Sequence, residues 1–169
     1  MKTDKMTPKE AFELFDTLKP VTLNELVEVG VWLGGEIITG HPMDGLLTAV
    51  RWYGKKFQQD GGIHPLLYKG INGKVYSVNA SEIPFKTIMT FPRWIIKILF
   101  FFFAPLIRTK NPCTQYWNVE YRGKITGAMV WDELPIVEIF ARIDSNTLLG
   151  VTVIKGISDP YFFTLTKPE

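Results

Sequence analysis

Apolar and polar residues alternate over short stretches throughout the second half of the chain, a pattern typical of half-buried β-strands. Turn-forming residues such as Arg122-Gly123 and Asp144-Ser145-Asn146 separate these stretches, as expected for strands linked by hairpins. Leu134-Pro135 interrupts one stretch, which is therefore either a strand or partly irregular. The strands predicted in this half are 114–121, 124–131, 133–143, 147–155 and 161–166.

In the first half, helical patterns precede and interrupt the strands. A helix at 7–18 begins with Thr7 as N-cap, Pro8 in the first turn and Glu10 as the capping-box partner. Asn72-Gly73 suits the type I′ turn of a hairpin. The other elements predicted here are a short helix at 22–27, a strand at 30–38, a helix at 42–57 and hairpin strands at 66–71 and 74–78.

Residues 94–107 form the most apolar segment, interrupted only by Lys97. Pro92 near its start and Pro105 near its end favour a helix between them. A bilayer-spanning helix needs about 20 apolar residues, so a transmembrane segment is disfavoured. Three interpretations remain: core packing, a lid over a barrel mouth, or peripheral contact with a membrane. The aromatic residues that would make the membrane contact are Trp94, Phe100, Phe101, Phe102 and Phe103.

About eight short strands with hairpin connections predict a mainly β fold, either a sandwich or an up-and-down antiparallel barrel. Helices are expected at the N-terminus, with one or two more packed over the barrel. The chain shows no repeat or linker, so residues 1–169 are expected to form a single domain. The aromatic share of 14% is high, and these side chains either line a cavity or enlarge the core.

Charge and cysteine content limit the expected binding partners and the expected cellular compartment. The net charge is +2 and no segment concentrates Lys and Arg, so nucleic acid is not an expected partner. Cys113 is the only cysteine, which excludes an intrachain disulfide, and the first residues lack the apolar core of a signal peptide. A cytoplasmic protein is predicted, with membrane association through residues 94–107 as an alternative. The oligomeric state does not follow from the sequence.

The first predicted strand opens with a motif, Gly30-x-Trp32-x-Gly34, that resembles the early Gly-x-Trp of the calycins, the lipocalins and fatty-acid-binding proteins. The resemblance implies a calycin-like barrel whose floor Trp32 closes, with Gly30 and Gly34 permitting the strand to bend. Residues 12–60 also resemble the GXWXG domain family. This second resemblance is carried by Thr39-Gly40-His41-Pro42-x-Asp44-Gly45 and Trp52-Tyr53-Gly54-Lys55-x-Phe57.

The remainder, residues 61–169, resembles the uncharacterised domain that usually follows the GXWXG domain. The motifs that carry this resemblance are Val119-Glu120-Tyr121-Arg122-Gly123, Asp132-x-Leu134-Pro135-Ile136, Leu149-Gly150 and Lys155-Gly156. The family implies small proteins of largely unknown function and no catalytic mechanism.

Candidate chemistry is sparse. His41 with Asp44 could act as an acid–base pair, although Thr39 or Asp44 could equally cap a helix. Two histidines and one cysteine do not make a metal site, so none is expected. Haem bound through a single axial histidine, His41 or His64, is an alternative cofactor. No nucleophile elbow or phosphate-binding loop is present.

The function predicted from these features is non-enzymatic binding or transport of an apolar or amphipathic small molecule, such as a fatty acid, inside the barrel. Lys55 and Arg122 are candidate anchors for an acidic head group. Three alternatives stay open: a small enzyme using His41 and Asp44, haem binding, and a membrane-surface adaptor. The candidate ligand-binding residues are Thr39, His41, Asp44, Trp52, Lys55, Tyr76, Tyr121, Arg122 and Trp131.

Overall fold

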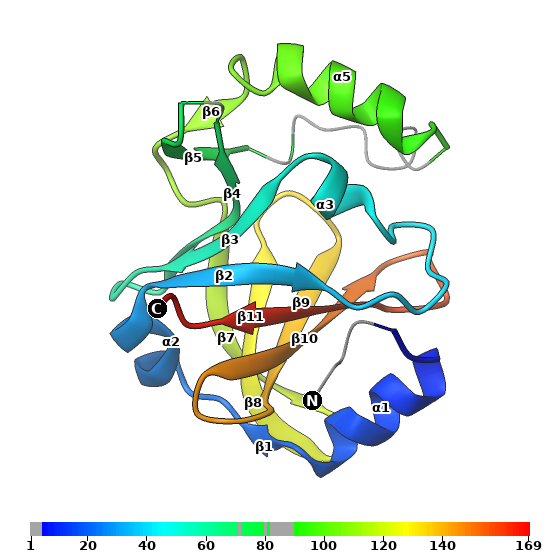
Figure 1. Ribbon diagram of the computed structural model, residues 1–169. Helices are drawn as coiled ribbons and strands as arrows, with labels where there is room; N and C mark the ends of the chain where they lie inside the picture. Colours follow the sequence, from blue (N-terminus) through cyan, green and yellow to red (C-terminus); the bar gives the residue numbers. More distant parts are fainter. Residues whose placement is uncertain (1–4, 71, 80, 82–89) are drawn as a thin grey trace.

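Eight antiparallel strands close into a barrel in the computed structural model of the protein (Figure 1). The structure describes residues 5–70, 72–79, 81 and 90–169. The ring runs β3, β2, β11, β10, β9, β8, β7 and β4, and a β3–β4 pairing completes it. Its strands are β2 (Val31–Glu36), β3 (Trp52–Phe57), β4 (Gly62–Lys69), β7 (Thr114–Tyr121), β8 (Lys124–Trp131), β9 (Ile136–Arg142), β10 (Thr147–Ile154) and β11 (Tyr161–Thr166). The predicted mainly β barrel with N-terminal helices is confirmed.

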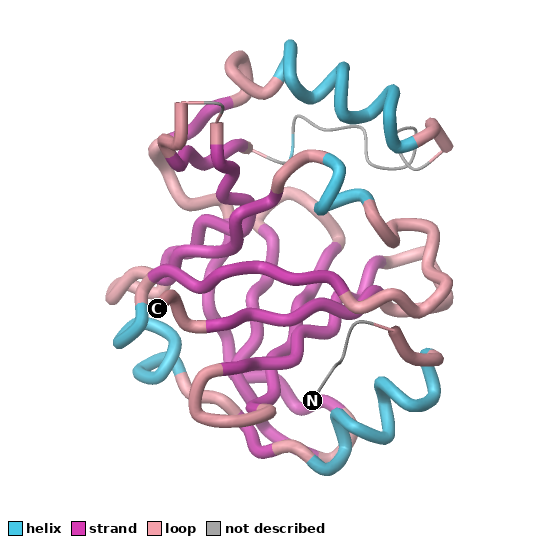
Figure 2. Tube along the Cα trace, in the orientation of Figure 1, coloured by secondary structure: helices cyan, strands magenta, loops and turns pink. Residues whose placement is uncertain are grey.

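Among the described residues, short strands and four helices surround the ring (Figure 2). β1 pairs with β9, while β5 and β6 extend the sheet beyond β4. These elements are α1 (Pro8–Thr17), β1 (Lys19–Pro20), α2 (Leu23–Val29), α3 (Leu46–Ala49), β5 (Val75–Val78), α5 (Arg93–Phe103) and β6 (Arg108–Thr109). The helix predicted within residues 94–107 is confirmed as α5, which begins after Pro92 and ends just before Pro105.

Alternation along the strands builds two hydrophobic cores, one inside the barrel and one outside it. On β9, Ile136 and Phe140 belong to the inner core, whereas Ile139 and Ala141 belong to the outer one. The outer core lies beneath α1, whose Phe15 is fully buried. The capping box expected at Thr7 and Glu10 starts this helix.

One end of the barrel is closed by α2. Trp32 is 2% exposed, and its indole Nε1 donates to the carbonyl of Leu26 in α2 at 3.0 Å. Thr126 connects the same end across the core: its hydroxyl accepts from the Val21 amide at 2.9 Å and donates to the Phe140 carbonyl at 2.7 Å. α3 and α5 lie at the opposite end, which we call the mouth (Figure 1).

The helix predicted at 42–57 is wrong. Only Leu46–Ala49 is helical, and Trp52–Phe57 forms strand β3. Arg51 takes a left-handed φ of 58° between the two, which ends the helix and redirects the chain. Pairing with β2 on one side and β4 on the other stabilises the extended form of residues 52–57. These long-range pairings outweigh the local helical pattern.

Both hairpins predicted from turn residues at Asn72-Gly73 and Arg122-Gly123 form. The first joins β4 to β5, and its Gly73 takes a positive φ of 77°. The end of its first predicted strand, residue 71, lies outside the described residues. Positive φ also occurs at Arg122 and Gly123, 51° and 77°, in the two-residue turn between β7 and β8.

Candidate functional site

The mouth half of the barrel interior contains a small apolar cavity with a charged pair in its wall. Its free volume is about 30 Å³, close to the share that one water molecule occupies in the liquid. Strands from around the ring contribute its lining, together with α3 and the loop before it. The lining residues are Met43, Leu47, Trp52, Lys55, Leu66, Trp131, Ile136, Glu138, Thr152, Ile154, Tyr161 and Phe163.

A bulge in β3 brings both Trp52 and Lys55 into this wall. Side chains three residues apart in a regular strand point to opposite faces. The β3–β4 register shifts on both sides of Gly54, whose φ of 144° suits glycine, so the two side chains share the interior. A Cβ at Gly54 would lie 1.8 Å from the Trp32 carbonyl oxygen, so the close approach of β2 and β3 requires glycine here.

Lys55 forms a buried ion pair with Glu138 across the barrel interior. The Lys55 Nζ lies 2.8 Å from the Glu138 Oε2, and the two side chains are 2% and 6% exposed. Nζ also donates to the Pro65 carbonyl at 3.2 Å, and the Trp131 Nε1 donates to the Glu138 Oε1 at 3.3 Å. Burial lowers the pKa of Lys55, and the Glu138 carboxylate opposes that shift.

Aromatic residues enclose the Lys55 ammonium. Its Nζ lies 5.3 Å from the Trp52 ring centroid and 5.0 Å from that of Phe163. The buried Nε1 of Trp52 has no hydrogen-bond partner among the described residues. Tyr161 donates to the Glu36 carboxylate at 2.6 Å, and burial raises the pKa of the phenol. The cavity wall therefore carries one N–H donor, that of Trp52, which no described residue accepts.

A much larger space lies at the mouth, between α5 and the barrel. This space, the α5 groove, has a volume of about 780 Å³, and α3 separates it from the interior cavity. Leu47 of α3 faces the cavity, whereas Ala49 faces the groove. The groove residues are Ala49, Val50, Arg51, Lys69, Gly70, Tyr76, Trp94, Lys97, Ile98, Phe100, Phe101, Phe102, Pro105 and Arg108.

The charged side chains among the described residues that line the α5 groove are all cations. Among the residues that the structure describes, none of these cations forms an ion pair. The Arg108 guanidinium lies over the Tyr76 ring at 4.1 Å from its centroid, a cation–π contact that does not itself use the N–H groups. The four cations are Arg51, Lys69, Lys97 and Arg108.

Contacts with the barrel mouth hold α5 in place. Ile96 and Ala104 are buried, and the Phe100 ring lies 4.4 Å from the Tyr68 ring, between centroids. Arg93 donates to the carbonyl oxygens of Pro42 and Asp44. The Asp44 carbonyl thereby connects α5 to the loop at residues 39–45, which we call the motif loop.

The side chains of His41 and Asp44 are occupied by the backbone of their own loop. Asp44 Oδ2 accepts from the amides of Thr39, Gly40 and His41 at 2.7 to 3.0 Å. His41 Nδ1 accepts from the Met43 amide at 3.0 Å, so the proton lies on Nε2, which donates to the Asp159 carbonyl at 3.1 Å. Burial lowers the pKa of His41. The buried hydroxyl of Thr39 and Oδ1 of Asp44 have no partner among the described residues.

His64 is also buried, with both ring nitrogens near polar partners. Nδ1 lies 3.1 Å from the Ser77 hydroxyl and Nε2 lies 3.4 Å from the Gln58 amide nitrogen. Within residues 5–70, 72–79, 81 and 90–169, no three His, Cys, Asp or Glu side chains gather into a group that could hold a metal ion.

The structure places the other candidate anchor, Arg122, away from both spaces. Arg122 binds Asp16 of α1 through Nε at 2.6 Å and Nη2 at 2.5 Å, and it lies over the Phe12 ring. Tyr121 packs edge-to-face on Phe15, also outside the barrel. Tyr121 ends β7 and Arg122 lies in the turn that follows, and both side chains contact α1, so neither lines the cavity or the α5 groove.

Of the ligand residues predicted from the sequence, Trp52, Lys55 and Trp131 meet in the cavity wall, and Tyr76 lines the α5 groove. Glu138 was missed, although it stands between Ile136 and Phe140 on an alternating apolar face. A charged residue at such a position signals a buried partner.

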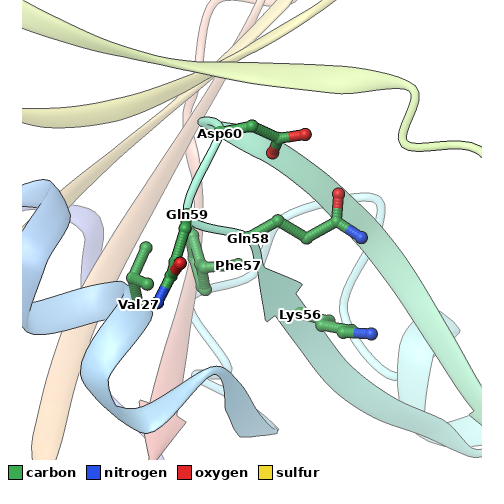
Figure 3. Close-up of a pocket in the computed structure, with 6 residues that line it drawn as sticks. All are labelled: Val27, Lys56, Phe57, Gln58, Gln59 and Asp60. Carbon is green, nitrogen blue, oxygen red and sulfur yellow. The ribbon is translucent and has the colours of Figure 1, made fainter.

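A third hollow lies beside the β3–β4 turn and is shallow and open (Figure 3). Lys56 and Gln58 point away from Val27, as Figure 3 shows, so the polar groups do not converge on one point. The residues around it are Val27, Lys56, Phe57, Gln58, Gln59 and Asp60.

Comparison with known proteins agrees with the motifs and the barrel. Residues 13–73 match the GXWXG protein family. Residues 112–167 match a domain of unknown function, DUF4334, so the resemblances to the GXWXG domain and to the domain that usually follows it are confirmed. No curated protein was found to match the chain. The fold is similar to the crystal structure of a protein from Thermomonospora curvata, with a TM-score of 0.73 and 26% identity over 99% of this chain and 91% of that one.

No helix among the described residues combines the length and the apolar character needed to cross a membrane.

Proposed function

We propose that this GXWXG protein binds an amphipathic small molecule, with an apolar body and an anionic head, in the α5 groove. The observation that carries the proposal is an aromatic groove of about 780 Å³ with four cations and no carboxylate among the described residues that line it. That volume lies within the range of small-molecule sites, and such sites combine mostly apolar walls with a few polar groups.

Size argues for the groove over the barrel interior. A fatty acid needs several hundred Å³, whereas the interior cavity has about 30 Å³. The sequence prediction located the ligand inside the barrel, and this proposal moves it to the mouth. The Lys55–Glu138 pair then serves the rigidity of the barrel on which the groove is built.

The cations determine which head group suits the site. Arg108 is held over Tyr76, so it offers a preorientated guanidinium to a carboxylate, sulfonate or phosphate. Lys97 projects from α5 and Lys69 from β4, on two different elements that line the groove. An anionic head between them would leave the apolar body along Trp94, Ile98 and Phe101.

The test uses 1-anilinonaphthalene-8-sulfonate, an aromatic sulfonate whose fluorescence rises in apolar surroundings, with displacement by a long-chain carboxylic acid. Arg108→Gln should weaken probe binding about fivefold, because one partly exposed ionic contact contributes about 1 kcal/mol. Ala49→Trp should abolish binding by filling the groove. Lys155→Gln, at an exposed position outside the groove, is the matched charge control and should bind like the natural protein.

Equal binding by all these variants would refute the groove as the site. Native mass spectrometry of the freshly purified protein adds a separate check, because a retained anionic ligand should be lost from Ala49→Trp and kept by Lys155→Gln.

A further inference from the structure

The outer side of α5 exposes large apolar side chains over most of its circumference. In Figure 1 this helix is the outermost element at the mouth, with its outer side turned away from the barrel. Phe103 is 56% exposed and Leu106, just after the helix, is 77% exposed. We call the exposed set the α5 face. It consists of Trp94, Ile98, Leu99, Phe101, Phe102, Phe103 and Leu106.

Such a face needs an apolar surrounding, because soluble chains rarely expose this much contiguous apolar surface. Most large exposed apolar side chains of the described residues fall between Phe91 and Leu106. The inner side of α5 is already used, since Ile96 and Ala104 are buried and Arg93 is bonded to the motif loop. The helix is thus fixed to the barrel and still exposes an apolar side, part of which also lines the α5 groove.

Charge around the α5 face identifies its partner. The segment from Thr90 to Lys110 contains Arg93, Lys97, Arg108 and Lys110 and not one Asp or Glu. Cations beside an exposed apolar helix match an anionic lipid surface, where the apolar side chains enter the acyl boundary and the cations meet phosphate. A second copy of this face would bring the same cations together, so self-association there is electrostatically opposed.

We propose that the α5 face docks the protein onto anionic lipid bilayers, lying in the interface without crossing it. Eleven residues make a helix of about 17 Å, roughly half the thickness of the hydrocarbon core. Trp94 at one end of the face has the amphipathic ring that favours the membrane–water boundary. The docked face lies beside the α5 groove, so a ligand entering or leaving the groove would pass directly between protein and lipid.

The test is flotation of the full chain with vesicles of phosphatidylcholine containing phosphatidylglycerol, compared with phosphatidylcholine alone. Phe103→Ser combined with Leu106→Ser should reduce vesicle binding about 100-fold, because each exposed apolar side chain contributes about tenfold to partitioning. The matched control is Trp117→Ser with Ile125→Ser, two apolar side chains on the barrel wall that are 57% and 69% exposed. The control should float like the natural protein.

Binding to the anionic vesicles should also fall as salt is raised from about 0.05 to 0.5 M, because screening weakens the attraction of the cations to phosphate. Three results would overturn the proposal: no flotation of the natural protein, an equal loss of vesicle binding in both double variants, or vesicle binding that depends on neither lipid charge nor salt. A concentration-dependent dimer that the Phe103/Leu106 variant abolishes would also overturn it, by assigning the face to a second copy.

The α5 face shares Trp94, Ile98, Phe101 and Phe102 with the groove, whereas Phe103 and Leu106 belong to the face and do not line the groove, so substituting these two separates lipid binding from ligand binding. The Phe103/Leu106 variant should keep 1-anilinonaphthalene-8-sulfonate binding at the groove, whereas Ala49→Trp should lose the probe and keep flotation. Thermal unfolding checks that each variant folds. If the double variant does not fold, Leu106→Ser alone carries the test with an expected tenfold loss.

Discussion

The Lys55–Glu138 pair allows a direct test of how the barrel interior is stabilised. Replacing Glu138 by Gln keeps the shape of the side chain and the acceptor for Trp131, but it removes the charge opposite an ammonium that is 2% exposed. Breaking a buried pair from one side typically costs 3–5 kcal/mol. We expect Glu138→Gln to lower the free energy of unfolding by about 3 kcal/mol, or to lower Tm by about 6–12 °C for a chain of this size.

The pH dependence of this loss has a defined sign. Without Glu138, burial lowers the pKa of Lys55 with no carboxylate to oppose it, so the folded state holds the proton less tightly than the unfolded state. Stability of the variant should therefore rise with pH between the lowered pKa and the ordinary value of 10.5. Urea unfolding at pH 7 and pH 9.5, each compared with the natural protein, measures the difference.

A second substitution separates charge from packing. Glu138→Leu combined with Lys55→Met removes both charges and should recover most of the lost stability, because apolar replacement of a buried pair is often neutral or favourable. A loss below about 1 kcal/mol in Glu138→Gln, or a loss that stays constant with pH, would refute the view that the pair is charged and dry.

Three further predictions concern the bulge in β3, the motif loop and the outer wall of the barrel. Gly54→Ala should cost more than about 3 kcal/mol or prevent folding, because the Cβ would meet the Trp32 carbonyl; soluble, cooperatively melting protein would contradict this. Asp44→Ala should cost about 2–3 kcal/mol through the loss of the shared acceptor for three amides, and unchanged denaturant unfolding would argue against that role. Arg122→Ala should cost at most about 1 kcal/mol and leave binding of 1-anilinonaphthalene-8-sulfonate intact, so weaker probe binding in titration would show that Arg122 reaches a ligand.

The motif loop does not line the α5 groove, but it helps to position the helix that does. Asp44 shapes the loop through its carboxylate and bonds Arg93 of α5 through its carbonyl. The same residue therefore stabilises the loop and positions the helix that forms the outer wall of the groove. Substitution of Asp44 is expected to alter ligand binding through the position of α5, without any contact to the ligand.

Several features of this protein followed from the sequence by itself. The strands of the second half were predictable because their alternation, period two, is a local property, and hairpin turns between them determine the neighbours. The first helix was predictable from Thr7, Pro8 and Glu10, and α5 from an apolar run between two prolines. The motifs also indicated the two similarities that the comparisons found, over residues 13–73 and 112–167.

Tertiary structure alone decided what the interior and the mouth contain. Residues 52–57 form a strand because β2 and β4 pair with them, and the bulge at Gly54 turns both Trp52 and Lys55 inward. The local sequence did not predict that Glu138 pairs with Lys55 or that Arg122 lies outside the barrel. Both depend on how distant strands and α1 meet in space. Packing of the assembled chain leaves little free volume in the interior cavity and a large volume in the α5 groove. These volumes depend on how distant elements pack together, so no single segment of the sequence predicts them.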